Sequence, residues 1–235
     1  MDFNLISFVF ETLRIAPPSK LTLLEAQTLA SASVHVPPFP PDIPALLTGI
    51  DSLELALQVK NVLLAVYPKE FEVNWVEGQM SQVGRLSDFQ LLTFDFQPST
   101  CLYIPSLGEG TSFESFAEIV AHLRAPDGCP WDKEQTHQTL RTHLLEEAYE
   151  TLTAMDENDS AGMNEEFGDL LLQIVLNSQI ANEADEFSMT KVIKAIYDKI
   201  VRRHPHVFGD VKVDGVDGVL ANWEKLKEKE RGEKK

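Results

Sequence analysis

LLEEAYETLTAM (residues 144–155) and NEEFGDLLLQIVLN (residues 164–177) are two apolar segments with helical periodicity, separated by a short polar break. At about 100° per residue, the apolar side chains of the second segment surround nearly the whole helix, which predicts a helix buried on most sides. Its polar residues fall on one narrow stripe, at steps of three and four: Glu166, Asp169, Gln173 and Asn177. Because unpaired carboxylates are costly to bury, we expect a cation to face this stripe.

The first segment supplies a second pair of carboxylates, Glu147 and Glu150, one helical turn apart. A short connection makes consecutive helices antiparallel neighbours, so Glu147, Glu150, Glu166 and Asp169 are expected to converge. Oxygen-only ligands favour Mg²⁺ or Mn²⁺ over zinc. A single E-x-x-E unit is more often a solvated helix face, and the polar stripe on the apolar second helix is the feature that favours a metal site.

The composition limits the broad class of protein. The chain has 235 residues, enough for one large or two small domains, and its formal net charge of −17 argues against a nucleic-acid partner. No apolar run reaches membrane-spanning length, and the N-terminal segment lacks the basic start of a signal peptide, so we expect a cytoplasmic protein with no membrane partner. Cys101 and Cys129 have no metal-binding or redox spacing.

Two domains are predicted, over residues 1–107 and 111–235, with the glycine-containing linker SLGEGT at 106–111. The second domain is expected to be helical throughout, and Thr111 and Glu114 have the spacing of a capping box for its first helix. The expected fold class is an α+β two-part chain, with a small N-terminal α/β segment followed by an all-α helical bundle.

The N-terminal segment shows both helical and strand periodicities. A probable helix cap at Asp51 precedes a clear amphipathic pattern, and a period-two alternation follows it along the chain. The expected elements are two helices and two strands, over residues 2–15, 50–67, 71–76 and 100–105.

Basic and aromatic residues outside the acidic quartet are candidates for substrate binding. Lys199 and Arg203 are one helical turn apart, as are Trp223 and Lys227. Such pairs are usually solvated, but beside a carboxylate–metal site they would bind a polyphosphate, with Trp223 as a stacking platform for a base. Trp131, in GCPWD, is either a packing anchor or a second base-stacking residue. The sequence has no P-loop and no G-x-G-x-x-G motif for phosphate binding.

Five motifs in order carry a family resemblance over residues 113–231. They are DGCPWDKEQT (127–136), LLEEAYETL (144–152), EFGDLLLQIV (166–175), DKIVRRHPHVFGD (198–210) and NWEKLKEKER (222–231). This region resembles the MazG-type nucleoside triphosphate pyrophosphohydrolases, which implies a MazG-like all-α bundle. The resemblance implies that Glu147, Glu150, Glu166 and Asp169 bind Mg²⁺. It also implies that the triphosphate and base are bound by Lys199, Arg203, Trp223 and Lys227.

A second resemblance concerns the N-terminal part. SFVFETLRI (7–15), LLAVYPKEFEVNWVEG (63–78) and TCLYIPSL (100–107) resemble the C-terminal half of a tetrapyrrole (corrin/porphyrin) methylase domain. The half that carries much of the S-adenosylmethionine site has no counterpart in the sequence. We therefore expect either a degenerate remnant or a truncated chain, and no tight binding of S-adenosylmethionine.

The leading hypothesis is Mg²⁺-dependent hydrolysis of a nucleoside triphosphate to a monophosphate and pyrophosphate, in nucleotide-pool housecleaning. Either Glu146 or Glu147 would accept the proton of the attacking water. The alternative is a non-catalytic, dimerising scaffold that recruits a partner through the methylase-like segment. The wide apolar surface of the helices predicts a homodimer or higher homo-oligomer. Base and sugar preference cannot be deduced from one stacking residue.

Overall fold

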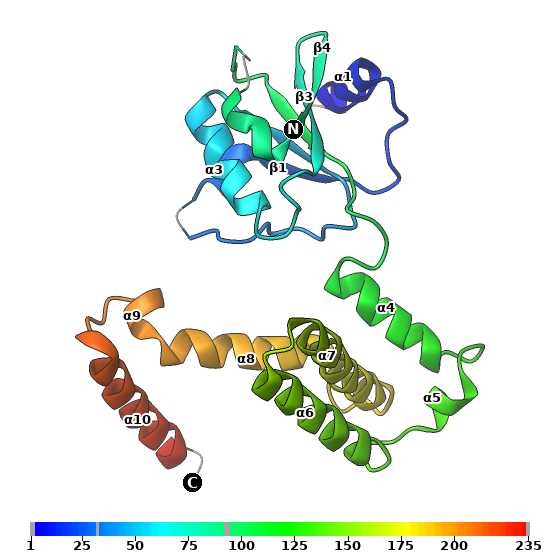
Figure 1. Cartoon of the computed structure of the whole chain (residues 1–235), viewed down its shortest axis with the longest axis vertical. Coiled ribbons are helices and arrows are strands. Elements are labelled where there is room, and N and C mark those ends of the chain that lie inside the picture. The colour runs from blue at the N-terminus through cyan, green and yellow to red at the C-terminus, as the bar shows by residue number, and fades with distance from the viewer. Residues whose placement is uncertain (1–2, 32, 92–94, 234–235) are drawn as a thin grey trace. The chain divides into compact units, whose positions relative to one another are not determined.

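The computed structural model describes residues 3–31, 33–91 and 95–233. Contacts within the chain define two compact units, Met1–Ile119 and Val120–Lys235. The first unit combines a sheet with helices, whereas every element described in the second unit is a helix (Figure 1). The predicted α+β two-part chain is therefore confirmed.

A five-stranded sheet forms the centre of the first unit. Its strand order is β1-β2-β5-β3-β4, with β1 and β2 parallel and the other neighbouring pairs antiparallel. The strands are β1 (Thr22–Glu25), β2 (Ala45–Thr48), β3 (Glu72–Glu77), β4 (Met80–Arg85) and β5 (Cys101–Ile104). The helices are α1 (Phe3–Leu13), α2 (Ala26–Leu29), α3 (Leu53–Leu63) and the 3₁₀ helix η1 (Leu86–Leu91).

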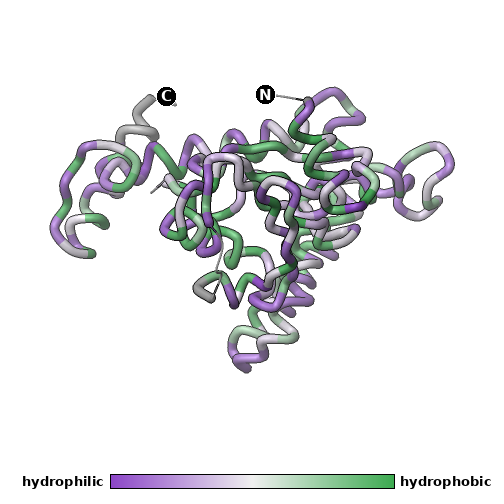
Figure 2. The backbone as a smooth tube through the Cα atoms, turned by 90° about the horizontal axis from the view of Figure 1, so that it is seen from above, coloured by the Kyte–Doolittle hydropathy of each residue, from purple (hydrophilic) through white to green (hydrophobic). Residues whose placement is uncertain are grey.

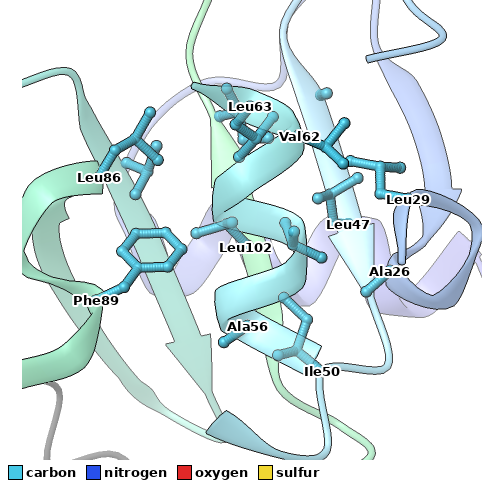
Figure 3. Close-up of a cluster of buried hydrophobic side chains, with 14 of the residues drawn as sticks. Ala26, Leu29, Leu47, Ile50, Ala56, Val62, Leu63, Leu86, Phe89 and Leu102 are labelled. Atoms are coloured by element: carbon cyan, nitrogen blue, oxygen red, sulfur yellow. The ribbon is translucent and has the colours of Figure 1, made fainter. Parts of the chain in front are cut away.

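Both faces of this sheet are covered by helices. Alternate residues of each central strand point to opposite sides, so each strand contributes to both cores. In β5, Leu102 belongs to the cluster that also contains buried residues of α2, α3 and η1, whereas Tyr103 packs with α1. Figure 3 shows α3 crossing the sheet between Leu86 and Phe89 on one side and Ala26 and Leu29 on the other. The first unit therefore has a core on each side of its sheet.

The second unit is a chain of helices, and α4 crosses the division between the units. The helices are α4 (Phe113–Arg124), α5 (Pro130–Glu134), α6 (Leu140–Glu157), α7 (Ser160–Glu183), α8 (Met189–Arg203), α9 (Pro205–Phe208) and α10 (Gly215–Glu233). Helices α6 and α7 pack along each other as a hairpin. This hairpin contains the two carboxylate-bearing segments.

Helix caps differ from the sequence expectations at two places. Ser52, not Asp51, caps α3, because its Oγ accepts a hydrogen bond from the Leu55 N–H at 3.3 Å. Ser112, not Thr111, caps α4 in the same way, with the Ser115 N–H at 3.1 Å. The side chain of Thr111 instead donates to the Gly108 carbonyl at 2.7 Å. The short strands β2 and β4 were not predicted.

None of the described helices is both long enough and apolar enough to cross a membrane. Figure 2 shows hydrophobic and hydrophilic residues mixed along the backbone.

Candidate metal centre

A tight connection fixes the register of α6 and α7. Asn158 ends α6 in the left-handed conformation (φ 55°), and the side chain of Asp159 accepts a hydrogen bond from the Ala161 N–H at 3.1 Å to start α7. Beyond the other end of the pair, His137 Nδ1 lies 2.8 Å from Asn177 Oδ1. The helices are therefore antiparallel, and the two carboxylate pairs face each other.

Three of the four predicted metal ligands come together in this hairpin. Single oxygen atoms of Glu147, Glu150 and Glu166 all lie within 4.8 Å of one another. Asp169 is outside this trio, although its charge is close enough to raise the pKa of both Glu147 and Glu166. An oxygen cluster of this size matches the needs of a hard divalent cation.

The carboxylates of the trio carry negative charge that no neighbouring cation neutralises among the described residues. Burial and, after it, the surrounding carboxylates raise the pKa of Glu147 and of Glu166 above the ordinary value for glutamate. Glu166 Oε2 is buried, with no hydrogen-bond partner in the described part of the chain. A divalent cation would satisfy this oxygen and relieve the repulsion, so the residues present fit a metal ion.

Glu146 lies near His143, whereas Glu147 belongs to the trio of carboxylates. The Oε2 atom of Glu146 lies 3.7 Å from His143 Nδ1 on the preceding turn of α6. The His143 ring also contacts Trp131, edge to face, with the ring centroids 5.9 Å apart. Trp131 remains 54% exposed, so the structure places it beside the acidic helix and leaves much of its ring accessible.

The predicted phosphate and base ligands lie further along the chain. Lys199 and Arg203 are in the second half of α8, and Trp223 and Lys227 are one turn apart on α10. Lys227 Nζ lies over the Trp223 ring, 4.4 Å from its centroid. In Figure 1, α8 leads from α7 towards α9 and α10. Among the described residues, no cation contributes to the pKa shifts of Glu147 and Glu166.

The prediction that α7 is buried on most sides is wrong for the single chain. Phe167, Leu171 and Ile174 are 48%, 38% and 45% exposed, whereas Gln173 is only 6% exposed. The polar stripe faces α6. Phe167, Leu171 and Ile174 face outward, whereas Val175 and Leu176 are buried. Periodicity identified the stripe correctly, but it could not show that part of the apolar surface of α7 stays uncovered.

Arg124, at the end of α4, was missed by the sequence analysis. Its side chain is 8% exposed and pairs with Glu183 at the end of α7, with Nη2 and Oε2 2.7 Å apart. The same guanidinium donates to the carbonyls of Asp132 and Gln135 around α5. Arg124 thus holds the segment that carries Trp131 against α7. No sequence spacing links these residues, so only the fold reveals the contact.

Part of the chain matches a known protein family. Residues 135–208 match the family model described as the MazG nucleotide pyrophosphohydrolase domain. The matched range contains the four predicted metal ligands together with Glu146, Lys199 and Arg203. Trp131, Trp223 and Lys227 lie outside the matched range.

Several relatives align with the chain. The uncharacterized protein YabN of Bacillus subtilis (strain 168) is 36% identical over 97% of this chain and 47% of its own length. The nucleoside triphosphate pyrophosphohydrolase/pyrophosphatase MazG of Thermotoga maritima is 44% identical over 54% of this chain and 48% of its own length. The nucleoside triphosphate pyrophosphohydrolase of Escherichia coli (strain K12) is 46% identical, with coverages of 49% and 44%. The chain spans about half the length of these curated relatives.

One solved structure is also similar to this chain. The crystal structure of a mazG-related protein from Thermotoga maritima is 28% identical and gives a TM-score of 0.43. The match covers 49% of this chain and 98% of that one. The methylase-like resemblance of the N-terminal part has no support in the family match, which lies entirely in the second unit, and it stays a prediction.

Proposed function

We propose that this chain hydrolyses nucleoside triphosphates to nucleoside monophosphate and pyrophosphate, with Mg²⁺ as the preferred cation and Mn²⁺ as a substitute. The observation that carries the proposal is the trio of carboxylates within 4.8 Å, formed by two helices of the MazG domain. The names of the Thermotoga maritima and Escherichia coli relatives support the same reaction class.

The proposed metal ligands are Glu147, Glu150, Glu166 and Asp169. Mg²⁺ held there would neutralise phosphate charge and make a bound water a better nucleophile. Asp169 lies near the trio without joining it, so we propose that it completes the ligand set through a modest change of its side chain. The raised pKa of Glu147 and Glu166 means that protons compete with the cation in acid.

Glu146 is the proposed proton acceptor. It lies next to the ligand Glu147 but outside the trio, and His143 lies 3.7 Å from its carboxylate. As water attacks the α-phosphorus, a new P–O bond forms and the bond to the β-phosphate oxygen breaks. The water proton passes to Glu146, and pyrophosphate leaves. Glu147 would serve this role only if it released the cation.

The basic and aromatic residues complete the proposed substrate site. Lys199 and Arg203, one turn apart near the end of α8, are proposed to bind the triphosphate. Trp223 is a proposed stacking platform for the base, with Lys227 over its ring adding positive charge. Trp131, exposed beside His143, is a second aromatic candidate for contacts with the nucleoside.

A homodimer is the proposed assembly, because three helices expose apolar stripes at helical spacing. On α8, Ile193, Ile196 and Ile200 are each 45–46% exposed, and no residue of this helix is classed as buried. On α6 and α7 the exposed stripes consist of Leu145, Tyr149, Leu152, Phe167, Leu171 and Ile174. A second copy that covers these stripes would complete the bundle.

Pyrophosphate release, measured with each of the common ribo- and deoxyribonucleoside triphosphates and Mg²⁺, tests the proposed activity. The variants Glu166→Gln and Asp169→Asn keep the side-chain shape and remove a charge, so we expect turnover to fall by about a hundredfold or more. Glu157→Gln, at an exposed position of α6, is the matched control and should retain activity. Wild-type turnover in both site variants would remove the quartet from the mechanism.

A further inference from the structure

A cleft of about 280 Å³ lies in the second unit, between α6, α7 and the start of α8. Leu140, Leu144 and Phe187 contribute apolar walls, and Gln173 and Asn177 contribute polar groups. Neither the metal ligands nor the proposed phosphate-binding residues line it. Its volume is below the range of about 300–1,000 Å³ typical of sites for whole drug-sized ligands. The cleft therefore suits one ring system and not an entire nucleotide.

The cleft lies about one helical turn from the carboxylates along both helices. On α7, Gln173 follows Asp169 by one turn, and on α6, Leu144 precedes Glu147 by about one turn. One turn of an α-helix advances about 5.4 Å. Because α6 and α7 are antiparallel, both advances run in the same direction, away from the Asn158–Asp159 connection. A ligand with its phosphates at the carboxylates can therefore place its other end in this cleft.

Gln173 lines this cleft and has a side-chain acceptor without a hydrogen-bond partner. The residue is 6% exposed, and its Oε1 is buried with no partner among the residues that the structure describes. The neighbouring amide of Asn177 is satisfied, since Nδ2 donates to the Gln173 carbonyl at 2.8 Å and Oδ1 lies 2.8 Å from His137 Nδ1. Leaving an acceptor buried and unpaired is unfavourable, which indicates a place for a ligand donor.

We infer that this cleft holds the nucleobase of the triphosphate and that Gln173 hydrogen-bonds its edge. The inference rests on the proposed function, because the position of the cleft matters only if the phosphates lie at the carboxylates. The apolar walls would pack against the faces of the base, and the glutamine amide would meet an N–H donor on its edge. Trp223 does not line this cleft, so in this inference the cleft walls take over the proposed stacking role of Trp223, and Gln173 is the specificity-determining residue.

The test compares binding of two probes in the presence of Mg²⁺. One probe is a non-hydrolysable nucleoside triphosphate analogue, and the other is inorganic tripolyphosphate, which has no base. Gln173→Leu should weaken binding of the nucleotide by roughly three- to tenfold and leave tripolyphosphate binding unchanged. Gln179→Leu is the matched control on the same helix, because Gln179 does not line the cleft and contacts Glu183 instead. It should change neither affinity.

A second variant, Phe187→Ala, tests the inference even if Gln173→Leu fails to fold. Phe187→Ala keeps Gln173 and removes part of an apolar wall, so it should also weaken nucleotide binding selectively. Equal nucleotide affinities of Gln173→Leu and Gln179→Leu would overturn the inference. An equal loss for both probes in Gln173→Leu would also overturn it. A wild-type chain that binds neither probe and releases no pyrophosphate would instead overturn the proposed function itself.

Discussion

The two units of this chain use their apolar residues in opposite ways. In the first unit, the strands and helices bury most of their apolar side chains on the two faces of one sheet. In the second unit, the long helices expose apolar stripes, while Gln173, Thr151 and Ser178 are buried. The first unit completes its core within one chain. The second unit buries polar groups in the hairpin of α6 and α7 and exposes apolar stripes, the feature on which the proposed homodimer rests.

The largest expected effect tests whether the exposed stripes form an interface. Ile196→Asp places a charge on the α8 stripe, whereas Val83→Asp places one on β4, where Val83 is 59% exposed. If a second copy covers α8, Ile196→Asp should raise the dissociation constant of self-association by roughly 30-fold or more. Val83→Asp should leave it unchanged. Sedimentation velocity over a dilution series measures both values, and equal behaviour of the two variants would contradict the proposed interface.

The next effect concerns the partly buried ion pair between Arg124 and Glu183 in the second unit. Arg124→Ala removes a guanidinium that is 8% exposed and leaves Glu183, at 38% exposed, without its partner. The free energy of unfolding should fall by about 2 kcal/mol, less than for a fully buried pair because water reaches Glu183.

The exposed pair between Lys194 and Asp198 provides the control for Arg124. These side chains are 69% and 47% exposed, and the pair spans one turn of α8. Lys194→Ala should therefore lower the free energy of unfolding by about 0.5 kcal/mol or less. Chemical denaturation at low salt measures both changes. Equal costs for the two substitutions would show that the second unit does not depend on the Arg124 contact.

The smallest expected effect concerns the pH dependence of stability without metal. Because the pKa of Glu166 is raised above its ordinary value of 4.5, the folded chain keeps this proton at a pH where the unfolded chain has lost it. The contribution of Glu166 to stability should therefore fall as the pH rises from about 4.5 through the raised pKa. Glu166→Gln removes this contribution, so the metal-free variant should melt at a higher temperature than the wild type near neutral pH.

Thermal melts across this pH range in a chelating buffer, repeated with Mg²⁺, measure the predicted change. Mg²⁺ should raise the melting temperature of the wild type and have little effect on Glu166→Gln, because ligand binding stabilises only the state that binds it. The control Glu157→Gln removes the same charge from an exposed site and should follow the wild type. Equal melting temperatures of the metal-free wild type and Glu166→Gln from pH 4.5 to neutrality would contradict the predicted contribution of Glu166.

Sequence periodicity predicted the elements of the candidate site better than their surroundings. The three- and four-residue spacing of Glu166, Asp169 and Gln173 identified the face of α7 that meets α6, because helix geometry alone determines that face. Periodicity wrongly predicted that Phe167 and Leu171 are buried, because it does not report how many helices cover a given face. Strand β4 was missed for a related reason: its exposed sequence MSQVGR gives little alternation.

Contacts between distant residues were beyond the reach of the sequence. Arg124 and Glu183 meet only after α4, α5 and α7 have packed, and the unpaired Oε1 of Gln173 depends on the neighbours of its side chain. The cap of α3 shows the same limit on a small scale. Both Asp51 and Ser52 are good capping residues, and the backbone geometry at Ser52 decided between them.

The connection made by Asn158 and Asp159 has a consequence for recognising distant relatives. With only these two residues between α6 and α7, the chain length separating Glu150 from Glu166 determines whether the acidic groups meet. A residue inserted within either helix between Glu150 and Glu166 would turn one acidic pair by about 100° and separate the groups. Among diverged sequences, an unchanged interval between the two acidic pairs is therefore a stricter sign of shared chemistry than identity at the intervening positions.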